Sequence, residues 1–161
     1  MFDSLYLFII MIIQVIIPPI PAEFIILEAA SRYGLLITTF VAGSGLYIGS
    51  ILVFFLSSHV RKYFKLDKVK IIEEKFQKYG FWVLLIRVLP YNPSDIISYA
   101  AGVLRYDKKK YVIITFFTSY IRVFLLSLLG FKISSLFELI IIFLLLFLTG
   151  LIISYFLYKK I

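Results

Sequence analysis

Long apolar stretches, separated by short charged ones, set the pattern of the sequence. Residues 35–58 and 111–130 are each long and apolar enough to cross a bilayer core of about 30 Å, which takes about 20 residues of helix. Residues 135–158 contain one charged residue, Glu138, and are followed by two lysines. We predict transmembrane helices in the first two stretches and a further one in the C-terminal part, 135–161.

Two other apolar stretches, 2–34 and 80–104, are each interrupted by prolines that precede a carboxylate. Proline lacks an N–H and disfavours helix in the residue before it, so each cluster predicts an unwound tip between two short helices. The clusters have the same spacing and lie 72 positions apart: Pro18, Pro21 and Glu23, then Pro90, Pro93 and Asp95. A repeated helix break in apolar sequence is typical of secondary transporters, in which two related halves meet at one polar site.

The distribution of lysine and arginine predicts how these stretches lie in the membrane. Seven basic residues lie within 61–78 and four within 105–110, on either side of 80–104. If 80–104 crossed the bilayer once, one basic cluster would lie outside, although basic residues favour cytoplasmic loops. A re-entrant hairpin keeps both clusters in the cytoplasm, and its arms are long enough to reach only about halfway across the bilayer core. The same argument makes 2–34 a hairpin that enters from the outer face.

The predicted fold is therefore an all-α membrane protein with two inverted-topology repeats in a single membrane domain. Residues 1–58 form the first repeat, with its hairpin tip at 18–21. Residues 80–134 form the second, with its tip at 90–93. Between them, 59–79 has apolar residues at helical spacing and is predicted to be an amphipathic linker on the cytoplasmic surface. Gly45 and Gly49 are spaced for close packing of the first long helix.

Five ionisable residues lie within apolar sequence, where a charge costs a few kcal/mol unless it is paired or faces a polar cavity. They are Glu23, Glu28, Arg87, Asp95 and Arg122. Glu23 and Asp95 occupy equivalent positions in the two repeats and are candidate cavity carboxylates that carry protons. Capping of the helices that follow is a second interpretation, compatible with the first. Glu28 is expected to pair with Arg32.

Arg87 and Arg122 are candidates for binding the phosphate of a lipid headgroup. Arg87 lies just before the second tip, and its planar guanidinium suits bidentate contact with phosphate. The alternative for Arg87 is a structural ion pair with Asp95 or Glu23. Arg122 belongs to a polar stripe on one helix face that is a candidate cavity wall. The other members of the stripe are Thr115, Thr118 and Ser119.

Composition narrows the classes of function. Of the 161 residues 62% are hydrophobic, well above the roughly 45–50% apolar content of soluble domains, so we expect a multi-pass protein of the plasma membrane. The net charge of +8 comes from basic residues at the ends of apolar stretches, which argues for membrane topology and against a nucleic-acid partner. With no cysteine and one histidine, His59, the sequence offers no thiolate or histidine-rich metal site. No motif indicates an enzyme, a catalytic residue or a cofactor.

In the order and spacing of its motifs the chain resembles the DedA family, also called the SNARE-associated or VTT-domain superfamily. The resemblance covers roughly 17–130. It rests on Pro18-Pro19-Ile20-Pro21-Ala22-Glu23, Gly45-x-x-x-Gly49, Tyr79-Gly80, Arg87-Val88-Leu89-Pro90, and Asp95 followed by Ala101-Gly102. It implies two inverted re-entrant hairpins and movement of phospholipid-type substrates between leaflets, with functional roles for Glu23 and Arg87. Bacterial members resemble proton-coupled translocases for polyprenyl phosphate or phosphatidylethanolamine, whereas eukaryotic relatives act as scramblases.

Two positions depart from the pattern of many bacterial members. Pro93 stands where those members have a second arginine, and Ser50 stands where they have an acidic residue. In its Pro90-x-x-Pro93 motif the chain is similar to the scramblase-like branch.

The leading hypothesis is a translocase (flippase or scramblase) for phosphate-bearing lipids, with phospholipid or polyprenyl phosphate as partner and protons as a further partner if transport is coupled. One alternative is a membrane-organising protein that transports nothing. Another is a small ion or proton transporter. The sequence leaves the oligomeric state open, a homo-oligomer included.

Overall fold

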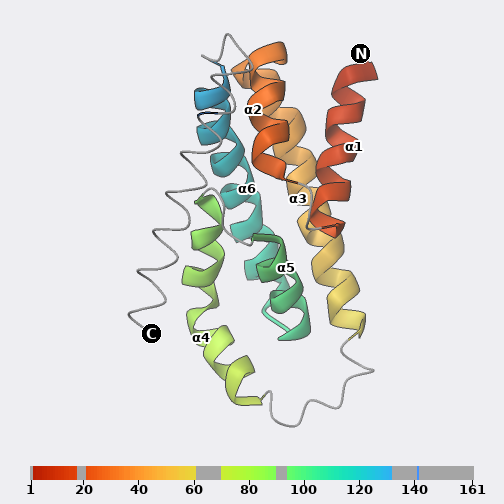
Figure 1. Cartoon of the computed structure of the whole chain (residues 1–161). Helices are drawn as coiled ribbons and strands as arrows, with labels where there is room; N and C mark the ends of the chain where they lie inside the picture. The colour runs from red at the N-terminus through yellow and green to blue at the C-terminus, as the bar shows by residue number, and fades with distance from the viewer. Residues whose placement is uncertain (1, 18–20, 61–69, 90–93, 132–140, 142–161) are drawn as a thin grey trace.

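The computed structural model describes residues 2–17, 21–60, 70–89, 94–131 and 141. These residues form helices and no strand (Figure 1). The helices are α1 (Phe2–Ile16), α2 (Ala22–Tyr33), α3 (Leu35–Val60), α4 (Lys70–Leu85), the 3₁₀ turn η3 (Ile86–Val88), α5 (Ser94–Val103) and α6 (Lys108–Gly130). The expected all-α class is thus confirmed for the described part of the chain, whereas the predicted helix at 135–161 lies almost wholly outside it.

Two of the described helices, α3 and α6, are long and apolar enough to cross a membrane. They are the stretches predicted from the sequence, with α3 reaching Val60 and α6 beginning at Lys108. Both keep large apolar side chains exposed, among them Phe40 and Leu56 on α3 and Phe117 on α6. Large exposed apolar faces are costly in water and are expected where a helix contacts lipid.

The long helices pack against each other, and each also carries shorter helices (Figure 1). α1 and α5 pack on α3, while α2 and α4 pack on α6. Small residues permit the closest of these contacts. A Cβ on Gly49 would lie 3.0 Å from a methyl carbon of Val15, and Gly45 meets α1 one turn earlier, as its spacing predicted. The core next to these contacts is apolar and includes Met11, Leu46 and Val123.

The ends of several helices follow from local chemistry. Pro21 directly precedes α2, and Gly34 ends it with a φ of 81°, which glycine adopts without steric cost. At the start of α6, Asp107 Oδ1 accepts a hydrogen bond of 2.8 Å from the backbone N–H of Lys110, as an N-cap does.

The second hairpin differs from its prediction at one boundary. We expected a surface linker ending at Tyr79 and a new helical arm beginning at Gly80, but α4 runs without a break from Lys70 to Leu85. Gly80 is buried inside this helix, where a Cβ would clash with the ring of Tyr106. The glycine therefore serves close packing rather than a helix end. The rest of the predicted linker, 61–69, lies outside the described residues.

Candidate functional site

Arg87 is a buried cation at the end of the first arm of the second hairpin. It lies in η3 and is 3% exposed. Its Nη1 donates to Thr115 Oγ1 of α6 at 3.2 Å, and its Nη2 donates to Ser50 Oγ of α3 at 2.7 Å. The guanidinium thus joins the two membrane-capable helices through neutral hydroxyl groups.

Two further residues surround this guanidinium. The hydroxyl of Tyr111 donates to the backbone carbonyl of Ser50 at 3.1 Å, and Tyr111 is also close enough to interact with Arg87. Asp95, on α5, is half-buried and within electrostatic reach of Arg87. The Nε–H of Arg87 has no hydrogen-bond partner among the described residues. A buried cation held largely by hydroxyl groups keeps capacity to bind an anion.

Arg122 has a different environment, because its guanidinium forms an ion pair with a carboxylate. Its Nη2 donates to Glu23 Oε1, from α6 to the first turn of α2. The side chains are 4% and 8% exposed, so the pair is buried. Paired charges are the usual form in which ions persist in an apolar interior.

The polar stripe on α6 connects the two arginines. Thr115, Thr118, Ser119 and Arg122 are all buried, which confirms that they share the inward face of this helix. Thr115 contacts Arg87, and Arg122 lies two helical turns further, about 10 Å along the axis. One helix face therefore positions both arginine sites.

The outcome differs among the residues predicted from the sequence. The pairing of Arg32 with Glu28 is confirmed at 2.7 Å. The structural alternative for Arg87 was an ion pair with Asp95 or Glu23. Glu23 pairs with Arg122 instead, whereas Asp95 lies within electrostatic reach of Arg87, so for Asp95 the alternative stays a prediction. Of the tip prolines, only Pro21 is described, and it is exposed; Pro18, Pro90 and Pro93 lie outside the described residues.

Sequence reasoning missed Ser50 and Tyr111 as parts of the site. For Tyr111 a signal existed, because it lies four residues before Thr115 and hence on the same face of α6. For Ser50 the signal was indirect. The resemblance identified this position as one where many relatives have an acidic residue, but the residue on its own gave no indication of a contact with Arg87.

Other parts of the described structure offer less for the binding of a polar ligand at depth. Among the described residues no group of three or more histidine, cysteine, aspartate or glutamate side chains is placed to hold a metal ion. A cavity of about 310 Å³ lies between α1 and α2, next to the Glu28–Arg32 pair. A second cavity, of about 410 Å³, lies at the other end of the bundle, near the start of α6. Neither is lined by Arg87 or Arg122.

Comparison with known proteins identifies the class to which this arrangement belongs. Residues 17–132 match the family model described as the VTT domain, which is the domain of the DedA family. No curated protein and no solved structure matches the chain. The matched region contains both long helices, both arginines and both candidate carboxylates. The chain is therefore a membrane protein that belongs to the VTT-domain, or DedA, family.

Proposed function

We propose that the protein is a lipid translocase of the plasma membrane, a flippase or scramblase, that moves phosphate-bearing lipids between leaflets. The headgroup would pass the buried polar site while the acyl or prenyl tails stay in the bilayer. Phospholipid and polyprenyl phosphate are the substrate classes that fit this chemistry.

The proposal includes the re-entrant, inverted-repeat topology predicted from the sequence, and the helix packing supports it. The first arm of each hairpin packs on the long helix of its own repeat, α1 on α3 and α4 on α6. The second arms are exchanged, with α2 on α6 and α5 on α3. A pseudo-two-fold relation between two halves produces this exchange. In Figure 1, α1 and α2 lie in the upper half of the bundle and α4 and α5 in the lower half.

A contact between the two hairpins supports their meeting within the bundle. The hydroxyl of Tyr99, on α5, donates a hydrogen bond of 2.9 Å to the backbone carbonyl of Ile16, the last residue of α1. α1 is too short, at 15 residues, to cross a bilayer core on its own. An irregular backbone between short helices is tolerated at membrane depth when it is buried in protein or lines a polar cavity.

The observation that carries the proposal is the buried Arg87 with its hydroxyl partners. A phosphate oxygen can take the place of the neutral hydroxyl group of Ser50 or Thr115 at the guanidinium. Arginine's planar fork matches phosphate with two parallel hydrogen bonds. Arg122 can contribute only when its ion pair with Glu23 opens, so we assign it the second headgroup contact rather than the first.

The two carboxylates provide the groups for proton coupling. Glu23 contacts Arg122, and Asp95 lies within electrostatic reach of Arg87, so each arginine has one carboxylate near it. These carboxylates occupy equivalent positions in the predicted repeats. If transport is coupled, protonation of such a carboxylate would free its arginine for the phosphate.

Leaflet exchange in liposomes tests the proposal. The purified full chain is reconstituted into vesicles that contain fluorescent phosphatidylethanolamine, phosphatidylglycerol or polyprenyl phosphate, and a membrane-impermeant quencher reports how much lipid reaches the outer leaflet. We expect faster exchange than in protein-free vesicles for at least one phosphate-bearing lipid. Folded protein that exchanges none of these lipids contradicts the proposal. In that case, a proton flux in the same vesicles would favour the ion transporter, and its absence the membrane-organising protein.

A further inference from the structure

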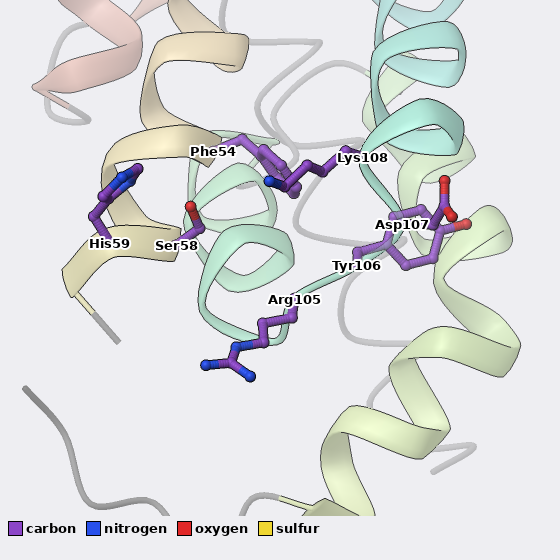
Figure 2. A pocket seen from close by; sticks show the side chains of 7 residues that line it. All are labelled: Phe54, Ser58, His59, Arg105, Tyr106, Asp107 and Lys108. Carbon is purple, nitrogen blue, oxygen red and sulfur yellow. The ribbon is translucent and has the colours of Figure 1, made fainter. Parts of the chain in front are cut away.

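The residues that line the 410 Å³ cavity near the start of α6 have no role in the proposed translocation of lipids (Figure 2). Its lining comes from the last turns of α3 and from the segment that connects α5 to α6. Both lie at the end of the bundle where basic residues concentrate, which the sequence places in the cytoplasm. The cavity therefore lies at the level of lipid headgroups if α3 and α6 cross the membrane.

Basic side chains from separate parts of the chain border this cavity. His59 comes from the end of α3, Arg105 from the α5–α6 connection, and Lys108 from the first position of α6. All three are exposed, so a ligand can reach them. His59 Nδ1 lies 2.8 Å from the backbone carbonyl of Phe55.

The acidic and phenolic groups of the cavity do not oppose an anion there. The carboxylate of Asp107 accepts the backbone N–H of Lys110 at 2.8 Å as the cap of α6, and in Figure 2 it points away from Ser58 and His59. The Lys108 side chain reaches back toward Phe54 in the same view. Burial, with a smaller effect of Asp107, raises the pKa of Tyr106, so its hydroxyl stays neutral.

The backbone of Arg105 is in the left-handed region, which residues other than glycine rarely adopt. Its φ is 51°, and among the described residues it is the one non-glycine residue with a positive φ. The backbone is fixed on both sides, because its N–H donates to Gly102 at 3.1 Å and its carbonyl accepts from Gln77 Nε2 at 2.7 Å. Glycine is the usual residue where a helix ends in this conformation. An arginine here retains strain that a ligand contact for its guanidinium would explain.

The apolar part of the cavity distinguishes a lipid from a free anion. Phe54 lies in the lining but is buried, because it stacks on Tyr111 with ring centroids 4.1 Å apart, so it forms the inner wall of the cavity. Phe55 and Leu56, the next residues of α3, are exposed large hydrophobic side chains. A phosphate bound by the basic residues would thus have apolar surface beside it for acyl chains.

We propose that this cavity is a binding site for the phosphate group of an anionic lipid headgroup at the cytoplasmic end of the bundle. The phosphate contacts Arg105 and Lys108, and the glycerol and upper acyl chains lie along the exposed Phe55 and Leu56 of α3. This site is separate from the buried site at Arg87. The proposal concerns lipid binding alone and does not depend on whether lipids cross through the bundle.

Equilibrium binding to the purified full chain in nonionic detergent tests the site. The probes are dioctanoyl phosphatidate, dioctanoyl phosphatidylcholine and inorganic phosphate, and thermophoresis measures each Kd. Arg105→Gly and Lys108→Gln are expected to weaken phosphatidate binding by about tenfold or more each, whereas Lys109→Gln changes it less than about twofold. Lys109 is the matched control because it is exposed on the same turn but does not line the cavity.

Thermal unfolding of the same proteins separates a binding role from a structural one. Arg105→Gly relieves a strained φ, so its melting temperature should equal or exceed that of the wild type while binding falls. Wild-type affinity in Arg105→Gly and Lys108→Gln, or an equal loss in Lys109→Gln, overturns the proposal. Equal affinity for inorganic phosphate assigns the cavity to free anions and overturns the lipid assignment. Loss of binding only in Arg87→Ala locates the phosphatidate at the buried site instead and also overturns it.

Discussion

Arg122 on α6 forms a buried ion pair with Glu23 on α2, 99 positions earlier in the chain. This pair joins the second long helix to the first hairpin. Arg87 approaches the same polar face of α6 but bonds there to the hydroxyl of Thr115. Arg122, on this helix face, and Arg87, which contacts the face from η3, therefore differ in how their charge is compensated, and this difference predicts different effects of substitution.

Substitution of each arginine by methionine should change stability differently. Arg122→Met leaves Glu23 buried without its cation, and we expect a loss of about 3 kcal/mol in the free energy of unfolding. Arg87→Met removes a cation whose hydrogen bonds go to neutral hydroxyl groups. The carboxylate within its electrostatic reach, Asp95, is only half-buried, so we expect a change of less than about 1 kcal/mol or a gain. Thermal unfolding in detergent, with each variant purified in the same way, measures both.

The double variant Glu23→Gln/Arg122→Met controls for the ion pair. It should recover part of the stability lost in Arg122→Met, because no uncompensated carboxylate remains. Equal losses in Arg87→Met and Arg122→Met, with no recovery in the double variant, would contradict the assigned pairing.

Alanine substitutions at Gly102 and Gly49 compare how closely α5 and α1 pack against α3. A Cβ on Gly102 would overlap with Ser57 Oγ and with the backbone carbonyl of Phe54, whereas on Gly49 it would lie 3.0 Å from the Val15 side chain and 3.1 Å from a backbone carbonyl. Gly102→Ala should therefore lower stability by about 2 kcal/mol or more, and Gly49→Ala by less. A larger loss for Gly49→Ala than for Gly102→Ala, measured by thermal unfolding, would show that α5 is packed less closely on α3 than described.

Local features of the fold could be predicted from the sequence because they depend on neighbouring residues. The two long helices follow from hydrophobic length, the Glu28–Arg32 pair from a four-residue spacing, and the polar stripe of α6 from helical periodicity. The prediction of a helix boundary at Gly80 was wrong because it considered neighbouring residues alone. The role of Gly80 depends on Tyr106, which lies far along the chain, so the residue appeared to be a helix boundary.

The contacts of the candidate site could not be predicted in the same way. Arg87 reaches Thr115 across 28 positions and Ser50 across 37, and these pairings depend on how α3 and α6 pack. A serine in apolar sequence gives no charge or periodic signal of such a contact. The sequence therefore indicated Glu23, Arg87 and Arg122 as charges within the bundle, but not the long-range partners that each of them has in the structure.

The predicted topology can be tested with single cysteines, because the chain has none of its own. We expect cysteines at Lys70 and Lys109 to be protected from an impermeant thiol reagent in intact cells, and one at Ser31 to be labelled. All three positions are exposed in the structure. Labelling of all three after permeabilisation is the control. If Lys109→Cys were labelled from outside while Lys70→Cys stayed protected, the second hairpin would instead be a span.

Asp95→Asn and Glu23→Gln test proton coupling. We expect Asp95→Asn to retain the fold, since Asp95 is half-buried and the amide has the same shape, and to flatten the dependence of lipid exchange on pH because it cannot titrate. Glu23→Gln should flatten it as well but also lower stability, since Glu23 is the partner of Arg122. Exchange rates in vesicles between about pH 5 and 8 measure the profile. An unchanged profile in both folded variants would leave a passive scramblase.

The most direct test of the central claim, that Arg87 contacts the lipid phosphate, is the initial rate of leaflet exchange in vesicles. The proteins compared are the wild type, Arg87→Lys, Arg87→Ala and, as the matched control, the exposed Arg32→Ala. We predict that Arg87→Ala lowers the rate by at least about tenfold and that Arg87→Lys also loses much of it, because an ammonium cannot make the planar bidentate contact. Arg32→Ala should keep the wild-type rate. A wild-type rate in folded Arg87→Ala would contradict the account.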